Sequence, residues 1–77
     1  MPTILRIKNY RFFFYSNDHS PAHIHVEKDD KTAKFTLDTL ELARSKGFNA
    51  KEISEIRKYV ADNIDLFKSK WNEHFNN

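Results

Sequence analysis

The spacing of the apolar residues changes from a period of two to a period of about 3.6 along the chain, and this change limits the folds open to it. Up to Leu37, short runs rich in Ile, Phe, Tyr, Thr and Val are separated by Asn and Asp, which is typical of strands joined by turns. After Leu37 the apolar residues recur at helical spacing. The sequence therefore predicts an α+β fold in which a sheet comes first and helices follow.

The first half of the chain predicts a four-stranded antiparallel sheet built from two successive hairpins. Asn and Asp tolerate the backbone of tight turns, so Lys8-Asn9 and Asp29-Asp30 are the expected turns. The polar segment 17–22, in which Pro21 fixes φ, is the expected loop between the hairpins. The expected strands are Ile4–Ile7, Tyr10–Ser16, His23–Lys28 and Lys31–Leu37.

Two helices are expected after the sheet. Asp38 and Glu41 have the spacing of a capping box, which predicts a short helix that ends at Gly47. Asn49 and Glu52 form a second such pair, which predicts a long amphipathic C-terminal helix that begins near residue 50. One face of that helix carries the apolar residues Ile53, Ile56, Val60, Ile64, Phe67, Trp71 and Phe75.

The predicted long helix exceeds the reach of the sheet. At about 1.5 Å per residue, roughly 25 helical residues extend to about 38 Å, whereas a strand of roughly six residues covers about 20 Å. The last turns, which carry Phe67, Trp71 and Phe75, must either fold over the sheet or the other helix, or contact another chain. A homodimer and a complex with a different partner are both open at this point.

Composition argues against several classes of protein. Seventy-seven residues suffice for one domain, 1–77, because two smaller cores would not offset the entropy of ordering the chain. No Cys is present, which excludes disulfides and thiolate zinc sites and fits a reducing cytoplasm. Arg6, Lys8 and Arg11 interrupt the apolar N-terminal segment, so neither a signal peptide nor a membrane span is expected. A net charge of +2 does not by itself indicate nucleic-acid binding.

Residues 18–27 contain most of the reactive side chains. Alternation along the predicted third strand puts His23, His25 and Glu27 on one face and sends the apolar residues between them to the core. His19 precedes this strand, and the loop could fold it back toward His23. The sequence therefore predicts a row of ionisable groups at the start of the second hairpin.

Three interpretations of this His row are open. The row could be a solvated sheet face without chemistry. It could bind zinc or another divalent metal, with His19, Asp18 or Glu27 joining the two imidazoles. It could also be a phosphate-directed site in which His23 and His25 act as base and acid while a basic side chain stabilises the developing charge. The nearest basic residues in sequence are Arg6, Lys8 and Arg11.

The aromatic run before the loop allows a packing and a binding interpretation. Alternation places Tyr10, Phe12 and Phe14 on one face, and Phe13 and Tyr15 on the other, so at least one set is expected in the core. Exposed aromatic rings on a sheet can stack on nucleobases. Tyr15, whose hydroxyl favours a wet edge beside the polar loop, is the ring to consider for such stacking.

Several segments give the chain a resemblance to a known family. They are Pro2-Thr3-Ile4, Tyr10-Arg11-Phe12-Phe13-Phe14-Tyr15-Ser16-Asn17, His19-Ser20-Pro21-Ala22-His23-Ile24-His25-Val26 and the late Trp71. With these segments the chain resembles the short bacterial proteins of domain of unknown function family 4160. That family carries no established activity. Its members are often encoded beside another small domain, so the resemblance implies one half of a toxin–antitoxin-like pair.

The leading hypothesis is a component of a bacterial toxin–antitoxin-like pair in the cytoplasm, whose partner is a small protein encoded nearby. As a toxin it would act on RNA, as a ribonuclease that needs no metal, with His23 and His25 as acid and base and His19 assisting. The RNA would be held by Arg6, Lys8, Arg11 and Tyr15.

Two alternatives to this hypothesis stay open. One is a non-catalytic interaction module that binds a partner or a second copy through Phe67, Trp71 and Phe75. The other is a small protein that holds a divalent metal at the His row.

Overall fold

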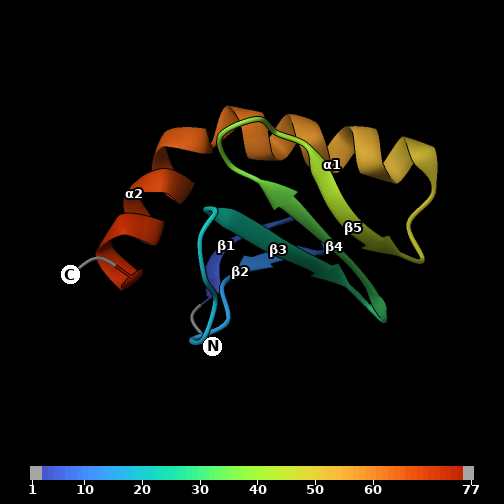
Figure 1. The fold of residues 1–77 in the computed structure, drawn as a ribbon. Coiled ribbons are helices and arrows are strands. Elements are labelled where there is room, and N and C mark those ends of the chain that lie inside the picture. The colour runs from blue at the N-terminus through green and yellow to red at the C-terminus, as the bar shows by residue number, and fades with distance from the viewer. Residues whose placement is uncertain (1–2, 76–77) are drawn as a thin grey trace.

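The computed structural model describes residues 3–75 and shows an antiparallel sheet of five strands followed by two helices (Figure 1). The strands pair in the order β1-β2-β3-β4-β5. The α+β class, with an antiparallel sheet ahead of the helices, is confirmed, and the sheet has one strand more than predicted. Pro2 and both ends of the predicted domain 1–77 lie outside the described residues. The elements are β1 (Thr3–Ile7), β2 (Tyr10–Phe13), β3 (His23–Lys28), β4 (Lys31–Thr36), β5 (Leu42–Lys46), α1 (Ala50–Asp62) and α2 (Ile64–Phe75).

Both predicted hairpins form. β1 pairs with β2 around Lys8-Asn9, and β3 pairs with β4 around Asp29-Asp30. In the first turn Lys8, rather than Asn9, takes the positive φ, at 54°, and in the second turn Asp29 takes a φ of 57°. Because Asn adopts this conformation more readily than Lys, we infer that strand pairing, and not the preference of the turn residues, sets the register of the first hairpin.

β2 ends at Phe13, before the predicted end at Ser16. The backbone N–H of Tyr15 donates to Asp18 Oδ2 at 2.9 Å, and the N–H of Asp18 donates to the Tyr15 carbonyl at 3.2 Å. A side chain thus takes the hydrogen bond that a longer strand would use. The loop therefore starts earlier than the aromatic alternation suggests.

The segment predicted as a short helix forms a strand instead. Residues 42–46 pair with β4 as β5, and the capping box expected at Asp38 and Glu41 is wrong. Leu40 has a φ of 58° and Gly47, the expected helix end, has a φ of 93°, and both conformations interrupt a helix. The sheet overrides the local spacing because β5 supplies hydrogen-bonding partners to the outer edge of β4.

The predicted long helix is divided at Asn63. α1 starts as expected, with Asn49 Oδ1 accepting a hydrogen bond from the Glu52 N–H at 2.8 Å. At its other end Asn63 Nδ2 donates to the Tyr59 carbonyl at 2.9 Å, and the Asn63 backbone leaves the helical region with φ −117° and ψ 23°. The break turns α2 away from the line of α1 (Figure 1). Within residues 3–75, neither helix has the length and apolarity needed to cross a membrane.

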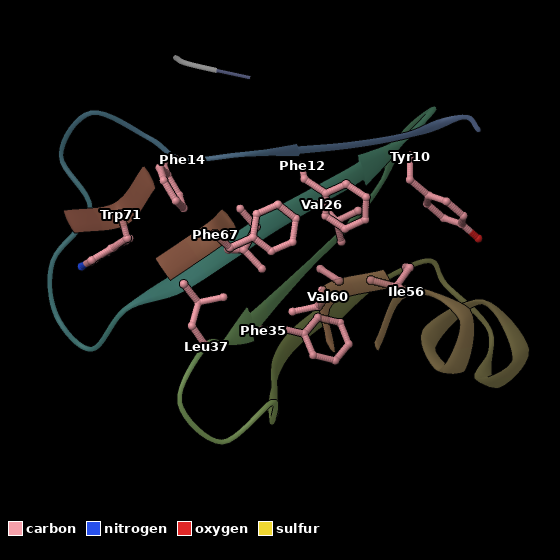
Figure 2. Packing of buried hydrophobic residues seen from close by; sticks show 12 residues of the cluster. Tyr10, Phe12, Phe14, Val26, Phe35, Leu37, Ile56, Val60, Phe67 and Trp71 are labelled. Carbon is pink, nitrogen blue, oxygen red and sulfur yellow. The ribbon is translucent and has the colours of Figure 1, made fainter. Parts of the chain in front are cut away.

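The core lies between one face of the sheet and the two helices (Figure 2). Phe12 stacks on Phe67 of α2 with ring centroids 5.5 Å apart, and Phe14 meets Trp71 edge-on at 5.3 Å. Tyr10, Phe12 and Phe14 all belong to the core cluster, which confirms the expectation that at least one set of the aromatic run lies in the core. The two ring contacts also show that α2 folds over the sheet, which is one of the arrangements expected for the last turns.

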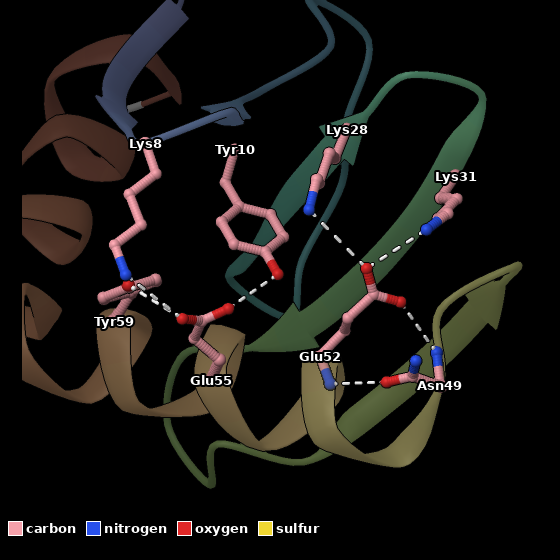
Figure 3. Close-up of polar contacts among 8 residues, drawn as sticks. All are labelled: Lys8, Tyr10, Lys28, Lys31, Asn49, Glu52, Glu55 and Tyr59. Atoms are coloured by element: carbon pink, nitrogen blue, oxygen red, sulfur yellow. Dashed lines mark hydrogen bonds and ion pairs between the residues drawn. The ribbon is translucent and has the colours of Figure 1, made fainter.

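Two glutamates of α1 join the helix to the hairpin turns on this side of the sheet (Figure 3). Glu55 accepts a hydrogen bond from Tyr10 Oη at 2.9 Å and pairs with Lys8 at 3.5 Å. Glu52 pairs with Lys31 at 3.1 Å. The turns of both hairpins are therefore attached to the same helix.

Most of the opposite face of the sheet is not covered by a helix of residues 3–75 (Figure 1), although His23, at one end of this face, packs against Trp71 of α2. Directly paired residues of antiparallel strands point to the same side, so the register assigns side chains to this face. We call it the open face. It is defined by Arg6, Arg11, Phe13, His23, His25, Glu27, Thr32, Lys34, Arg44 and Lys46.

Candidate functional site

A loop carboxylate lies against two strand imidazoles at one end of the open face. β3 alternates as predicted, with Ile24 and Val26 fully buried. Asp18 Oδ1 lies 3.2 Å from Nε2 of His23 and 3.2 Å from Nε2 of His25. The three atoms lie within 4.8 Å of one another, so these residues could hold a metal ion. We call Asp18, His23 and His25 the Asp–His cluster.

Both ring nitrogens of His23 are engaged within the chain. Nδ1 lies 2.8 Å from the Pro21 carbonyl oxygen, which can only accept a hydrogen bond, so Nδ1 carries a proton. Trp71 packs against the ring with centroids 5.0 Å apart, and the residue is 8% exposed. Nε2 is thereby directed at Asp18.

His25 is half-buried between aromatic rings. Its ring stacks on Phe13 at 5.5 Å, and Tyr15 meets it edge-on at 4.6 Å. Burial lowers the pKa of His25 and outweighs the Asp18 carboxylate, which raises it, while Lys34 adds a smaller decrease. His25 is therefore a neutral imidazole at physiological pH.

Asp18 keeps its charge although its side chain is only 10% exposed. Burial on its own would raise the pKa of Asp18, but the Tyr15 N–H and then the His25 imidazole hold it below its usual value. A carboxylate with so little access to water needs positive or hydrogen-bonding partners. The loop and β3 provide them.

A row of cross-strand neighbours leads from the cluster to two basic side chains. His25 pairs with Lys34 on β4, and Lys34 pairs with Arg44 on β5. Neighbouring strands lie about 4.8 Å apart, so both basic groups can contact one anion. Among residues 3–75, neither Lys34 nor Arg44 forms an ion pair. We call His25, Lys34 and Arg44 the basic row.

Two depressions border these groups. A shallow pocket of about 140 Å³ contains the basic row and Tyr15, which is 40% exposed. A second pocket, of about 400 Å³, is lined by loop residues including His19 together with Asp18, His23 and Lys34. The cluster and the row are therefore both reachable from the open face.

The structure separates the residues that the sequence grouped as catalytic. His23 and His25 lie together in the cluster, whereas His19 is exposed on the loop beside it and is not one of its three members. Glu27, also a candidate metal ligand, pairs with Arg11 at 3.1 Å instead. Asp18 is the third member of the cluster.

The predicted phosphate-binding residues also occupy different places. Lys8 reaches Glu55 on the helix-covered side of the sheet, away from the His row. Arg11 lies on the open face, where it donates to Thr3 Oγ1 at 2.8 Å and covers the Phe13 ring at 4.3 Å. Arg6 pairs with Arg11 in the register and is exposed.

The residues predicted as a partner interface pack largely within the chain. Phe67 is fully buried, Trp71 is 7% exposed, and Phe75 is partly buried against the same core. The core-packing alternative therefore accounts for Phe67 and Trp71 without a second chain.

Two residues of the basic row were missed at the sequence level. A two-residue turn at Asp29-Asp30 already places Lys34 opposite His25, so the predicted hairpin contained the signal for Lys34. Arg44 had no such signal because its segment has helical spacing.

Comparison with known proteins gives a family but no described activity. A family model described as a domain of unknown function, DUF4160, matches residues 9–72, a span that includes the Asp–His cluster and the basic row. No curated protein and no solved structure matches the chain.

Proposed function

Because this chain belongs to the DUF4160 family, whose description names no activity, we propose its function from the geometry of the open face. We propose that the protein binds RNA as one component of a bacterial toxin–antitoxin-like pair in the cytoplasm. The RNA part of the proposal is carried by one observation, the basic row beside an exposed tyrosine. The pair part comes from the gene arrangement that the family resemblance implies.

The basic row has the features of a phosphate-binding surface. Lys34 and Arg44 are adjacent, free of carboxylate partners among the described residues, and directed to the uncovered side of the sheet. Tyr15 borders the same pocket and offers a ring on which a base can stack. Together they fit a phosphate and a neighbouring base of a single strand.

The cluster geometry favours RNA binding over acid–base cleavage by His23 and His25. Nε2 of each ring is directed at Asp18 and not at the solvent, and Nδ1 of His23 is bonded to Pro21. Cleavage through this pair stays a prediction. RNA cleavage retained by a correctly folded His25→Ala variant would contradict it.

The binding proposal is tested with a short, labelled single-stranded RNA by fluorescence anisotropy. Lys34→Gln and Arg44→Gln should each weaken binding severalfold and reduce the slope of log K against log salt by about 0.7, the value for one lost phosphate contact on a single strand. Lys51→Gln and Lys58→Gln, which remove exposed charges from α1, are matched controls. If the control variants lose as much RNA affinity as the variants of the basic row, the row is not a specific RNA-binding surface.

The pair proposal is tested by co-expressing the untagged protein with the product of its neighbouring gene. Native mass spectrometry should then show a heteromer of the two proteins. If the neighbouring gene product is folded and in excess but no heteromer forms, the pair proposal is overturned. The RNA-binding proposal is then decided by the anisotropy experiment alone.

A further inference from the structure

We propose that Asp18, His23 and His25 bind a divalent transition-metal ion of the Zn²⁺ type. The inference goes beyond RNA binding and does not depend on it. It starts from a conflict in the hydrogen bonding of His23. Nδ1 donates to Pro21, so the neutral ring has only a lone pair at Nε2, 3.2 Å from an ionised carboxylate oxygen.

Two acceptors at this distance require a positive charge between them. Either a proton on His23 Nε2 or a metal ion can supply it. The second imidazole favours the ion, because Nε2 of His25 lies at the same distance, 3.2 Å, from the same Asp18 oxygen. Three donor atoms, one from a loop and two from a strand, thus lie within 4.8 Å of one another.

Two of the three distances between the donors match those around a small ion. With bonds of about 2.0–2.1 Å, two ligands of a tetrahedral zinc lie about 3.3–3.4 Å apart. The two contacts of Asp18 Oδ1, at 3.2 Å each, are close to this value. The two imidazole nitrogens lie within 4.8 Å of each other, so a rotation of the rings has to complete the tetrahedral spacing when an ion enters.

Outer hydrogen bonds hold two of the ligands in the orientation that binding needs. A metal-bound imidazole commonly donates its other N–H to a backbone carbonyl, as His23 Nδ1 does to Pro21. The second oxygen of Asp18 accepts the Tyr15 N–H at 2.9 Å, which fixes the carboxylate plane. Two imidazoles and one carboxylate are also a donor set that zinc and similar divalent ions accept.

Three protein ligands leave a coordination position open. The pocket lined by Asp18, His23 and Lys34 gives water or an anion access to this position. If the proposed RNA binding is correct, a phosphate oxygen can fill it while Lys34 contacts the same group, and this last step alone rests on that function.

The test is metal binding by untagged, chelator-treated protein. Calorimetric titration with Zn²⁺ should give one site per chain, and titration with Co²⁺ should give visible absorption bands typical of nitrogen and oxygen ligands. Asp18→Asn and His25→Ala should each weaken Zn²⁺ binding by more than about tenfold, since the loss of an outer partner alone costs about 10–100-fold. Both variants spare the buried His23, and circular dichroism verifies their fold.

Two histidines outside the cluster provide controls. His19→Ala and His74→Ala remove exposed imidazoles and should leave Zn²⁺ affinity within about twofold. Zn²⁺ should also raise the Tm of the wild type, but not that of Asp18→Asn, because an ion that binds only the native state stabilises it. Absence of a one-to-one site in the wild type, or a Zn²⁺ affinity of Asp18→Asn and His25→Ala equal to that of the wild type, would overturn the proposal.

Discussion

Tyr10 Oη donates a hydrogen bond of 2.9 Å to Glu55 Oε1, 45 residues away in the chain, and so joins the start of β2 to α1. Tyr10 is 2% exposed. The Tyr10→Phe variant should lose about 1–2 kcal/mol of unfolding free energy, because an acceptor loses its donor without a change in packing. Urea denaturation measures the difference. Tyr15→Phe, at an exposed ring, should change stability by less than about 0.5 kcal/mol.

Tyr10 also predicts how stability responds to alkali. Burial, followed by the hydrogen bond to Glu55, raises the pKa of Tyr10 from 10.0 to about 12. The unfolded chain therefore releases this proton first, and the contribution of Tyr10 is complete below pH 10 and is lost as pH rises toward 12. Urea midpoints across this range should fall less steeply in Tyr10→Phe than in the wild type. If the urea midpoints of the two proteins fall in parallel with pH, the alkaline loss of stability does not come from Tyr10.

Glu52 predicts the response to acid. The Asn49 N–H, and then Lys31, lower the pKa of Glu52 below its usual value of 4.5. For a carboxyl group with a lowered pKa, the stabilisation is present above the unfolded value and is lost as pH falls through the folded one. Glu52→Gln should flatten the decline of Tm below pH 4.5, with Glu73→Gln, on the exposed face of α2, as the control.

Phe67 distinguishes core packing from partner binding. The ring is fully buried against Phe12, so Phe67→Ala should destabilise the isolated chain by about 3–5 kcal/mol. Thermal unfolding at several protein concentrations measures this loss. Phe75→Ala, at a partly buried ring, should cost less. If Phe67→Ala leaves the stability of the isolated chain unchanged but abolishes binding of a partner, Phe67 belongs to an interface and not to the core.

The fold could be predicted where the information is local. The alternation of residues 23–28 and 31–36 and a two-residue turn suffice to pair β3 with β4 in the correct register. β5 could not be predicted in this way, because its partner is the edge of β4 and its own sequence has helical spacing. The break at Asn63 depends likewise on a contact with the sheet, since only a redirected α2 covers Phe12 and Phe14.

The same distinction applies to the site. Strand alternation placed His23 and His25 on one face, and this prediction of the His row holds. Spacing could not show that Asp18, and not His19 or Glu27, is the third residue of the cluster, because this depends on how the loop folds. The contact that fixes the loop is the hydrogen bond from the Tyr15 N–H to Asp18. It can form only because β2 ends before Tyr15, which leaves this N–H without a strand partner.

The sequential order of the strands has a consequence for how the chain folds. Every strand pairs with its neighbour in sequence, so the sheet forms by closing short loops, which is the fast part of folding. α2 packs against β2 from the other end of the chain, and its docking closes the longest loop. Because Trp71 lies on α2 and touches His23, we expect tryptophan fluorescence in stopped-flow refolding to report the final step, after the hairpins have formed. The arrival of α2 is then also the event that shields His23 from water.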